Sequence, residues 1–220
     1  MHCLIDADSI VYRAGFATEG EPIQNTLQTA KNMLQTCYSK GETHSVYLTG
    51  EGNFRKELYP EYKANRTGKR PQAYDEIREY MQKHHGAQVS KGIEADDLVS
   101  IAANALRDNL VEHVVCSIDK DLNTFPGIKY NYVKDYTYTV SREEANKAFI
   151  TQIITGDKSD NILGMKFLDV KKSSPWYTMA KDNGLLSKRL GPVRAAKIIE
   201  ALEAGCIGSG VSLNFFLSSL

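Results

Sequence analysis

Short apolar runs alternate along the chain with longer stretches in which apolar residues return every three or four positions. The short runs predict buried strands, at Cys3–Asp6, Ser45–Thr49, His113–Ile118 and Lys129–Val133. The longer stretches predict helices, at Ser9–Ala14, Asn25–Ser39, Gln72–His84, Glu94–Asp108 and Glu143–Thr155. Because helices separate successive strands, the pattern predicts an α/β fold with a mostly parallel central sheet flanked by helices on both faces.

Acidic residues occur where the predicted strands end. Asp6 follows the first strand, and Asp119 and Asp121 follow the strand His113–Ile118. Other acids open or follow the last two predicted helices, at Glu94, Asp96, Asp97, Asp157 and Asp160. Ligands of parallel α/β sheets bind beyond the carboxyl ends of the strands, so we expect these carboxylates to converge on one site.

Convergent carboxylates predict a metal site, because like charges repel one another unless a cation lies between them. Oxygen ligands without a His or Cys pattern favour Mg²⁺ or Mn²⁺ over zinc, and so many acids favour two ions. Taken singly, each acid also suits a helix-dipole partner, a turn residue or a cap. Their recurrence along the chain favours the shared site.

Composition adds little about partners, because 27 basic and 27 acidic residues cancel over the 220 positions. Lys and Arg do outnumber Asp and Glu in two stretches that flank the acids, Arg55–Lys91 and Lys166–Lys197, which suits a polyanionic substrate. The four cysteines are widely spaced, and the sequence has neither a signal peptide nor an apolar run of membrane length. We therefore expect a cytoplasmic protein, without disulfides and without a membrane partner, and a monomer.

Several short motifs, in a fixed order, resemble the 5′-nuclease family of phage 5′→3′ exonucleases, flap endonucleases and the nuclease domain of bacterial DNA polymerase I. They are Ile5-Asp-Ala-Asp-Ser9, Tyr62-Lys63-Ala-Asn-Arg66, Ile93-Glu-Ala-Asp-Asp-Leu98, Ser117-Ile-Asp-Lys-Asp-Leu122 and Thr155-Gly-Asp-Lys-Ser-Asp-Asn-Ile162. The resemblance implies a PIN-like nuclease fold with a C-terminal helix-hairpin-helix element. It implies three regions: a nuclease core at 1–155, a DNA-binding region at 156–207 and a tail at 208–220.

The same resemblance implies roles for individual residues. The metal ligands would be Asp6, Glu94, Asp96, Asp97, Asp119, Asp121, Asp157 and Asp160. The catalytic residues would be Lys63, Arg66, Asp6 and Asp119. DNA would be contacted by Tyr62, Lys63, Arg66, Arg70, Gly191, Val193, Arg194 and Lys197. Simpler interpretations stay open, because Lys63 and Arg66 also suit a solvated basic loop, and Gly191-Pro192 suits an ordinary helix start.

The chain departs from the family pattern in two places. An acid that many members carry after the second strand is missing at Thr49, and Glu51 is the nearest replacement. An insertion at about 166–189 separates the acidic motif ending at Asn161 from the Gly191 turn. The first departure puts one metal ligand in doubt. The second either widens the predicted duplex-binding surface or is a decorated loop.

Two other functions compete with a nuclease. The sequence Asp6-Ala-Asp8 after a strand imitates the nucleophile motif of haloacid-dehalogenase-type phosphatases, although that leaves the Tyr62–Arg66 motif unexplained. A catalytically silent DNA-junction-binding protein would fit the missing acid at Thr49. The hypothesis that explains most motifs is a metal-dependent, structure-selective 5′→3′ exonuclease or flap endonuclease, which hydrolyses DNA near 5′ ends, flaps or junctions. Activity on RNA–DNA hybrids is left open.

Overall fold

A computed structural model describes residues 1–164 and 191–203, and its chain divides into two compact units. The first unit comprises residues 1–60 and 67–145, and the second comprises 61–66 together with the chain from 146 onward. Each unit is described by itself. The strands of the first unit are β1 (His2–Asp6), β2 (Thr43–Leu48), β3 (Gln88–Val89), β4 (His113–Cys116), β5 (Gly127–Asn131) and β6 (Tyr136–Val140). Its helices are α1 (Asp8–Ala17), α2 (Ile23–Tyr38), α3 (Phe54–Leu58), α4 (Tyr74–His85), α5 (Ala95–Asp108) and the 3-10 helix η1 (Lys120–Thr124).

The six strands form one sheet in the order β3-β2-β1-β4-β5-β6. Every neighbouring pair is parallel except β5 and β6, which form an antiparallel hairpin at one edge. In the register of the central strands, Ile5 pairs with Val46 on one side and with Cys116 on the other. The carboxyl ends of β1, β2 and β4 therefore lie at the same edge of the sheet, as the sequence predicts.

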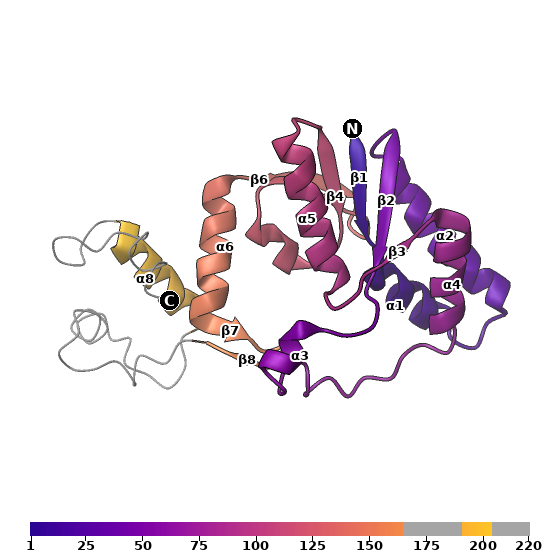
Figure 1. The fold of residues 1–220 in the computed structure, drawn as a ribbon, viewed down its shortest axis with the longest axis horizontal. Helices are drawn as coiled ribbons and strands as arrows, with labels where there is room; N and C mark the ends of the chain where they lie inside the picture. Colours follow the sequence, from indigo (N-terminus) through magenta and orange to yellow (C-terminus); the bar gives the residue numbers. More distant parts are fainter. Residues whose placement is uncertain (165–190, 204–220) are drawn as a thin grey trace. The chain divides into compact units, whose positions relative to one another are not determined.

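Helices cover both faces of this sheet because successive strand residues point in opposite directions. Cys3 and Ile5 of β1 pack in one buried cluster with apolar residues of α1, α2 and α4. Leu4, between them, packs on the other face with Val99 and Ala103 of α5. Figure 1 shows α5 on one side of the strands and α1, α2 and α4 on the other. The two clusters are the core that holds the strand ends in place.

Local signals fix the ends of the two helices that matter most for the site. α5 begins with a capping box, in which Glu94 and Asp97 each accept a backbone hydrogen bond at the helix start. α4 ends at Gly86, whose left-handed backbone (φ 61°) closes the last turn through a bond from its N–H to the Met81 carbonyl. These caps set where each helix meets the loops that carry charged residues.

The second unit contains most of α6 (Arg142–Thr155), the short hairpin of β7 (Gly156–Asp157) and β8 (Ile162–Leu163), and α8 (Pro192–Glu203). The turn of this hairpin carries the acidic motif of residues 157–161. The segment 61–66 belongs to the same unit although it lies about a hundred residues earlier, because it is hydrogen-bonded to that turn.

The predicted sheet and its flanking helices are confirmed, whereas four elements of the first unit were missed. The edge strand β3 has two residues, and α3 and the 3-10 helix η1 have five each, which is too short for a periodic signal. β6 was missed because most of its residues are exposed, so no buried run marks it. The predicted insertion at 166–189 and tail at 208–220 lie outside the described residues, so the predicted boundaries stay predictions. Within residues 1–164 and 191–203, no helix is long and apolar enough to cross a membrane.

Candidate metal and phosphate site

The centre of the predicted acidic site is Asp6, the last residue of β1. Its side chain is buried, with 6% of the residue exposed, and its Oδ2 accepts a hydrogen bond of 2.9 Å from the Ser117 hydroxyl. The pKa of Asp6 is raised to about 7, first by burial and next by the negative charge of Asp8. The Ser117 hydrogen bond opposes this, while Asp96 and Asp119 add to it. Four carboxylates from three parts of the first unit thus act on one another.

The loop after β4 presents the next pair of acids. Ser117 N–H is bonded to the Tyr130 carbonyl of β5, which continues the sheet by one residue. The Ser117 hydroxyl also accepts from the Asp119 N–H at 3.0 Å, and Asp119 Oδ1 caps η1 by accepting from the Asp121 N–H at 2.9 Å. Asp119 is exposed and Asp121 is half-buried. The turn that follows Ser117 therefore holds both carboxylates just beyond the carboxyl edge of the sheet.

The acids at the start of α5 divide into two kinds. Asp96 is half-buried and acts on the pKa of Asp6, as described above. Asp97 instead forms two hydrogen bonds of 2.7 Å with the guanidinium of Arg55, one to each carboxylate oxygen. Its Oδ2 also accepts from the Glu94 N–H at 3.0 Å. Such a two-pronged ion pair fixes geometry, so Asp97 joins α3 to α5, and its prediction as a metal ligand stays a prediction.

Sequence reasoning missed the connection between Asp8, Thr49 and Arg78. Both oxygens of Asp8 accept from the Thr49 N–H at 3.1 Å, and Oδ1 pairs with Arg78 of α4 at 3.2 Å. Arg78 also donates to the Thr49 carbonyl at 2.5 Å. The Thr49 hydroxyl accepts from the Ala95 N–H, which caps α5. Thr49 thus has a structural role, and an aspartate two positions after Asp6 was the only signal of this network in the sequence.

In the second unit the predicted acids lie in the β7–β8 turn. Asp157 is buried, and its Oδ1 accepts from the backbone and the hydroxyl of Ser159 at 2.7 and 2.5 Å. Burial works to raise the pKa of Asp157, but the hydrogen bonds from Ser159 and Asp160 outweigh it, so the pKa is lowered. Asp160 accepts hydrogen bonds from Arg66 Nη2 at 2.5 Å and from the Tyr62 hydroxyl at 2.9 Å, and it forms an ion pair with Lys63 Nζ at 3.7 Å. The structure therefore brings the predicted phosphate-binding residues together with a predicted metal ligand.

The other predicted DNA contacts are less constrained. Arg70 is exposed, and its guanidinium lies over the Tyr74 ring, 4.5 Å from the centroid. Gly191, Val193 and Lys197 are exposed at the start of α8, and the side chain of Arg194 lies outside the described part of the molecule. Glu51, the expected substitute for the missing acid, is exposed. The helix after Gly191-Pro192 is confirmed, whereas the first half of the predicted hairpin falls outside the described residues.

Within residues 1–164 and 191–203, no three Asp, Glu, His or Cys side chains are close enough to hold a metal ion in the present arrangement. The chemistry of the donors nevertheless fits a divalent cation. Asp6 is a buried carboxylate whose ionised form is disfavoured by burial and by Asp8, Asp96 and Asp119. A cation among these oxygens would remove that cost. Oxygen donors of this kind suit Mg²⁺ or Mn²⁺.

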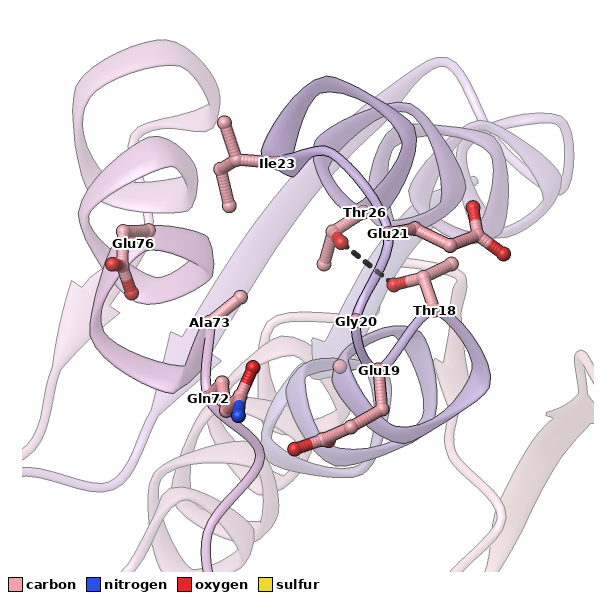
Figure 2. A pocket seen from close by; sticks show the side chains of 10 residues that line it. Thr18, Glu19, Gly20, Glu21, Ile23, Thr26, Gln72, Ala73 and Glu76 are labelled. Carbon is pink, nitrogen blue, oxygen red and sulfur yellow. Dashed lines mark hydrogen bonds between the residues drawn. The ribbon is translucent and has the colours of Figure 1, made fainter.

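A cavity of about 170 Å³ lies elsewhere in the first unit, where α1 ends and α2 and α4 begin. Figure 2 shows its lining, which includes Thr18, Glu19 and Glu76, with Thr18 and Thr26 joined by a hydrogen bond of 2.7 Å. None of the predicted site residues lines it. The cavity is therefore separate from the acidic edge.

Comparison with known proteins identifies the class that this fold and site define. A family model described as "5′-3′ exonuclease, N-terminal resolvase-like domain" matches residues 1–147. The chain belongs to this 5′-3′ exonuclease family, whose members are nucleases.

Individual relatives agree with this assignment. The 5′-3′ exonuclease of Mycoplasma pneumoniae is 30% identical, over 98% of this chain and 84% of its own length. Among solved structures, the T5 D15 protein co-crystallised with metal ions has a TM-score of 0.61 at 19% identity, covering 83% of this chain and 75% of that one. The bacteriophage T5 D15 flap endonuclease, in a complex with DNA and metal ions, has a TM-score of 0.55 at 18% identity, covering 83% and 75%. These two likenesses confirm the fold.

Proposed function

We propose that this enzyme is a structure-selective 5′→3′ exonuclease or flap endonuclease, which hydrolyses DNA phosphodiesters near 5′ ends, flaps or junctions with two Mg²⁺ or Mn²⁺ ions. The observation that carries the proposal is the buried Asp6 carboxylate, whose pKa is raised by burial and by three neighbouring carboxylates. A folded protein tolerates such crowding at neutral pH when a cation compensates it. The relatives named above supply the nuclease class.

The roles of the residues follow from their chemistry. Asp6, Asp96, Asp119 and Asp121 would hold the metal at the carboxyl edge of the sheet. Glu94, Asp97, Asp157 and Asp160 stay predicted ligands from the family resemblance. The bound ions would lower the pKa of a water molecule and offset charge on the phosphate. Lys63 and Arg66 would bind the phosphate oxygens as charge develops on them. Binding of this kind addresses the sugar-phosphate backbone, so we expect selectivity for DNA structure and little for base sequence.

The test is cleavage of a matched set of DNA substrates. End-labelled 5′-flap, nicked, blunt and single-stranded DNA would be incubated with Mg²⁺ or with EDTA, and the products sized on a gel. We expect Mg²⁺-dependent products with a 5′-phosphate, from flap or nicked DNA in preference to blunt duplex. The absence of cleavage from every substrate in Mg²⁺ and in Mn²⁺ would refute the proposal.

Variants then test the assignment of the acids. Asp119→Asn removes a carboxylate from the predicted metal site, and we expect it to reduce cleavage at least about a hundredfold, the scale of losing an electrostatic catalytic group. Asp108→Asn is the matched control, because that carboxylate is 69% exposed at the end of α5 and, in the described residues, its ion pair is the surface pair with Arg107. Full activity in Asp119→Asn would remove Asp119 from the site.

The two competing functions have distinct signatures. A haloacid-dehalogenase-type phosphatase would form a covalent aspartyl-phosphate on Asp6 and would release phosphate from small monoesters. A catalytically silent DNA-junction-binding protein would bind flap DNA equally with and without Mg²⁺ and leave it intact. The comparisons favour neither, because the named relatives are 5′-3′ exonucleases. The oligomeric state, which we propose to be monomeric, is read from light scattering of the purified protein.

A further inference from the structure

Three donors converge on the carboxylate of Asp160 within the second unit. We call Tyr62, Lys63, Arg66 and Asp160 the Asp160 cluster. Arg66 Nη2 reaches Oδ1 at 2.5 Å, while the Tyr62 hydroxyl and Lys63 Nζ reach Oδ2 at 2.9 and 3.7 Å. A guanidinium, a phenol and an ammonium around one anion are the donors that also recognise a phosphate group.

The contact is built into the backbone, because the loop that carries the donors is tied to the turn that carries the acceptor. The Lys63 N–H donates to the Asp160 carbonyl at 2.8 Å, and the Asn161 side chain donates to the Glu61 carbonyl at 2.9 Å. Lys63 adopts a left-handed backbone with φ 57°, which is strained for a residue other than glycine. Such strain persists only where surrounding contacts enforce it.

The two sides of the cluster differ in exposure. The side chains of Asp160 and Lys63 are 14% and 18% exposed, whereas that of Arg66 is 53% exposed. Arg66 therefore offers donors to solvent while Nη2 is held by Asp160 and Nε by the Ser159 carbonyl at 3.2 Å. A DNA phosphate can approach Arg66, but it meets an arginine whose charge is already balanced by an internal carboxylate.

We propose that Asp160 is an internal anion that occupies the phosphate-binding side chains Lys63 and Arg66 in the DNA-free protein, and that a DNA phosphate must displace it. Asp160 is then a positioning residue, since it acts on the substrate through Lys63 and Arg66 and keeps both in the loop geometry that a phosphate will use. This deepens the proposed function, on which it rests, by adding a competition at the phosphate-binding residues. Because a DNA phosphate has to displace Asp160, the protein binds DNA more weakly than it would without that carboxylate.

A double-mutant cycle on DNA affinity tests the exchange without using catalysis. The wild-type 220-residue chain, Asp160→Asn, Arg66→Gln and the double variant would be titrated with a fluorescent 5′-flap DNA in EDTA. Removing the competing charge should tighten binding by about fivefold in the Arg66 background, the scale of a charge-assisted contact. In the Arg66→Gln background the same change should tighten binding by less than about 1.5-fold, because the main competing pair is already gone.

Asp157→Asn is the matched control, because it removes the same charge from the same turn at a carboxylate that Ser159 holds and no cation pairs with in the described residues. Any general effect of net charge should tighten binding equally in both Arg66 backgrounds for this variant. Thermal melting of each variant establishes that the turn is folded. Loss of a merely structural contact would weaken DNA binding, so a gain of affinity distinguishes the two roles.

The outcomes separate this inference from the proposed function. Asp160→Asn that leaves affinity unchanged, weakens it, or tightens it equally in both backgrounds overturns the inference, as does a protein that binds no DNA in any form. Wild-type cleavage in Mg²⁺ is measured in parallel on the same flap. If the protein cleaves the flap but Asp160 and Arg66 show no coupling in DNA affinity, the inference alone is wrong. If the coupling is present but no DNA is cleaved, the nuclease proposal alone is wrong.

Discussion

Asp6 carries a charge in the buried interior at the end of β1. It is 6% exposed, it lies among three other carboxylates, and its strongest stabilising contact is the Ser117 hydroxyl. Asp6 lowers the stability of the metal-free fold, because its ionised form is disfavoured there. Residues of this kind are retained for function. Asp97, only one helical turn from Glu94, has the opposite character, since both of its oxygens bind Arg55.

Replacing these two aspartates should therefore change stability in opposite directions. In EDTA at pH 8, Asp6→Asn should raise the free energy of unfolding by about 1–3 kcal/mol, because it removes a crowded buried charge and keeps an acceptor for Ser117. Asp97→Asn should lower it by about 1–3 kcal/mol, because it breaks a charge-assisted pair and weakens the α5 cap. Chemical denaturation of both variants beside the wild type checks this. The same sign for both would contradict it.

Lys129 on β5 predicts a pH effect away from the acidic edge. It is 3% exposed, its Nζ has no hydrogen-bond partner in the described residues, and it lies 3.3 Å from the centroid of the Phe125 ring. Burial lowers the pKa of Lys129 from 10.5 to about 7. Between pH 7 and 10.5 the unfolded chain then binds the proton that the folded protein lacks, so stability should rise with pH across that window.

Lys129→Met tests that effect, since methionine fills a similar volume without a charge. We expect the variant to be more stable than wild type at pH 7 by about 1–3 kcal/mol, less than the full pKa shift because the Phe125 ring favours the cation. The difference should shrink as pH rises to 9.5. Denaturation curves at both pH values measure it, and a difference independent of pH would remove Lys129 as the cause.

Sequence spacing located the individual acids better than it assigned their roles. Asp6 and Asp119 were found because acids that directly follow apolar runs lie at strand ends, and parallel pairing brings those ends together. Spacing could not separate Asp96 from Asp97, because the difference is made by Arg55, 42 positions earlier in the chain. It could not find the role of Arg78 either, since a single arginine in an amphipathic helix normally faces solvent.

At the scale of elements, the carboxyl edge is held together by side chains that bridge secondary structure. Asp8 at the start of α1, the end of β2 and Arg78 of α4 meet at Thr49, which in turn caps α5. The sequence predicted all four of these elements, because each has a buried run or an apolar stripe. It missed β6 and the bridges, because an exposed edge strand and a polar contact leave no periodic pattern.

Arg78→Met should show how much the contact between Arg78 and Asp8 contributes to the free energy of unfolding. Arg78 is 12% exposed and Asp8 is 28% exposed, so removing the guanidinium leaves a half-buried carboxylate near Asp6 without its ion-pair partner. We expect a loss of about 1–3 kcal/mol in the free energy of unfolding. In the double variant with Asp8→Asn, most of that loss should be recovered. Urea denaturation of the four proteins tests it, and strictly additive losses would show that the pair does not act as a unit.

At the scale of the whole molecule, each compact unit is assembled from segments that are not continuous in the sequence. Residues 61–66 interrupt the first unit in sequence and are bonded instead to the turn at 158–161. Sequence analysis placed the Tyr62–Arg66 motif in the core because the family resemblance implied a single nuclease core over residues 1–155. Only the fold reveals that this basic motif and the late acidic motif are one structural unit, which is why Asp160 was predicted as a metal ligand and not as a partner of Arg66.

Metal should link the stability of the molecule to the acidic edge. A ligand that binds only the folded state adds RT ln(1 + [L]/Kd), or about 1.4 kcal/mol at ten times Kd, which is a rise of about 3–6 °C in the melting temperature of a chain of this size. Adding Mg²⁺ or Mn²⁺ to the EDTA-treated protein should produce this rise, and Asp6→Asn should remove most of it. Asp108→Asn, which alters an exposed acid on α5, should keep it.

If Asp6→Asn melts at a higher temperature in EDTA yet loses the metal response, one carboxylate accounts for both effects, because the repulsion that destabilises the metal-free fold is what the cation relieves. A full metal response in Asp6→Asn would separate metal binding from this edge of the sheet.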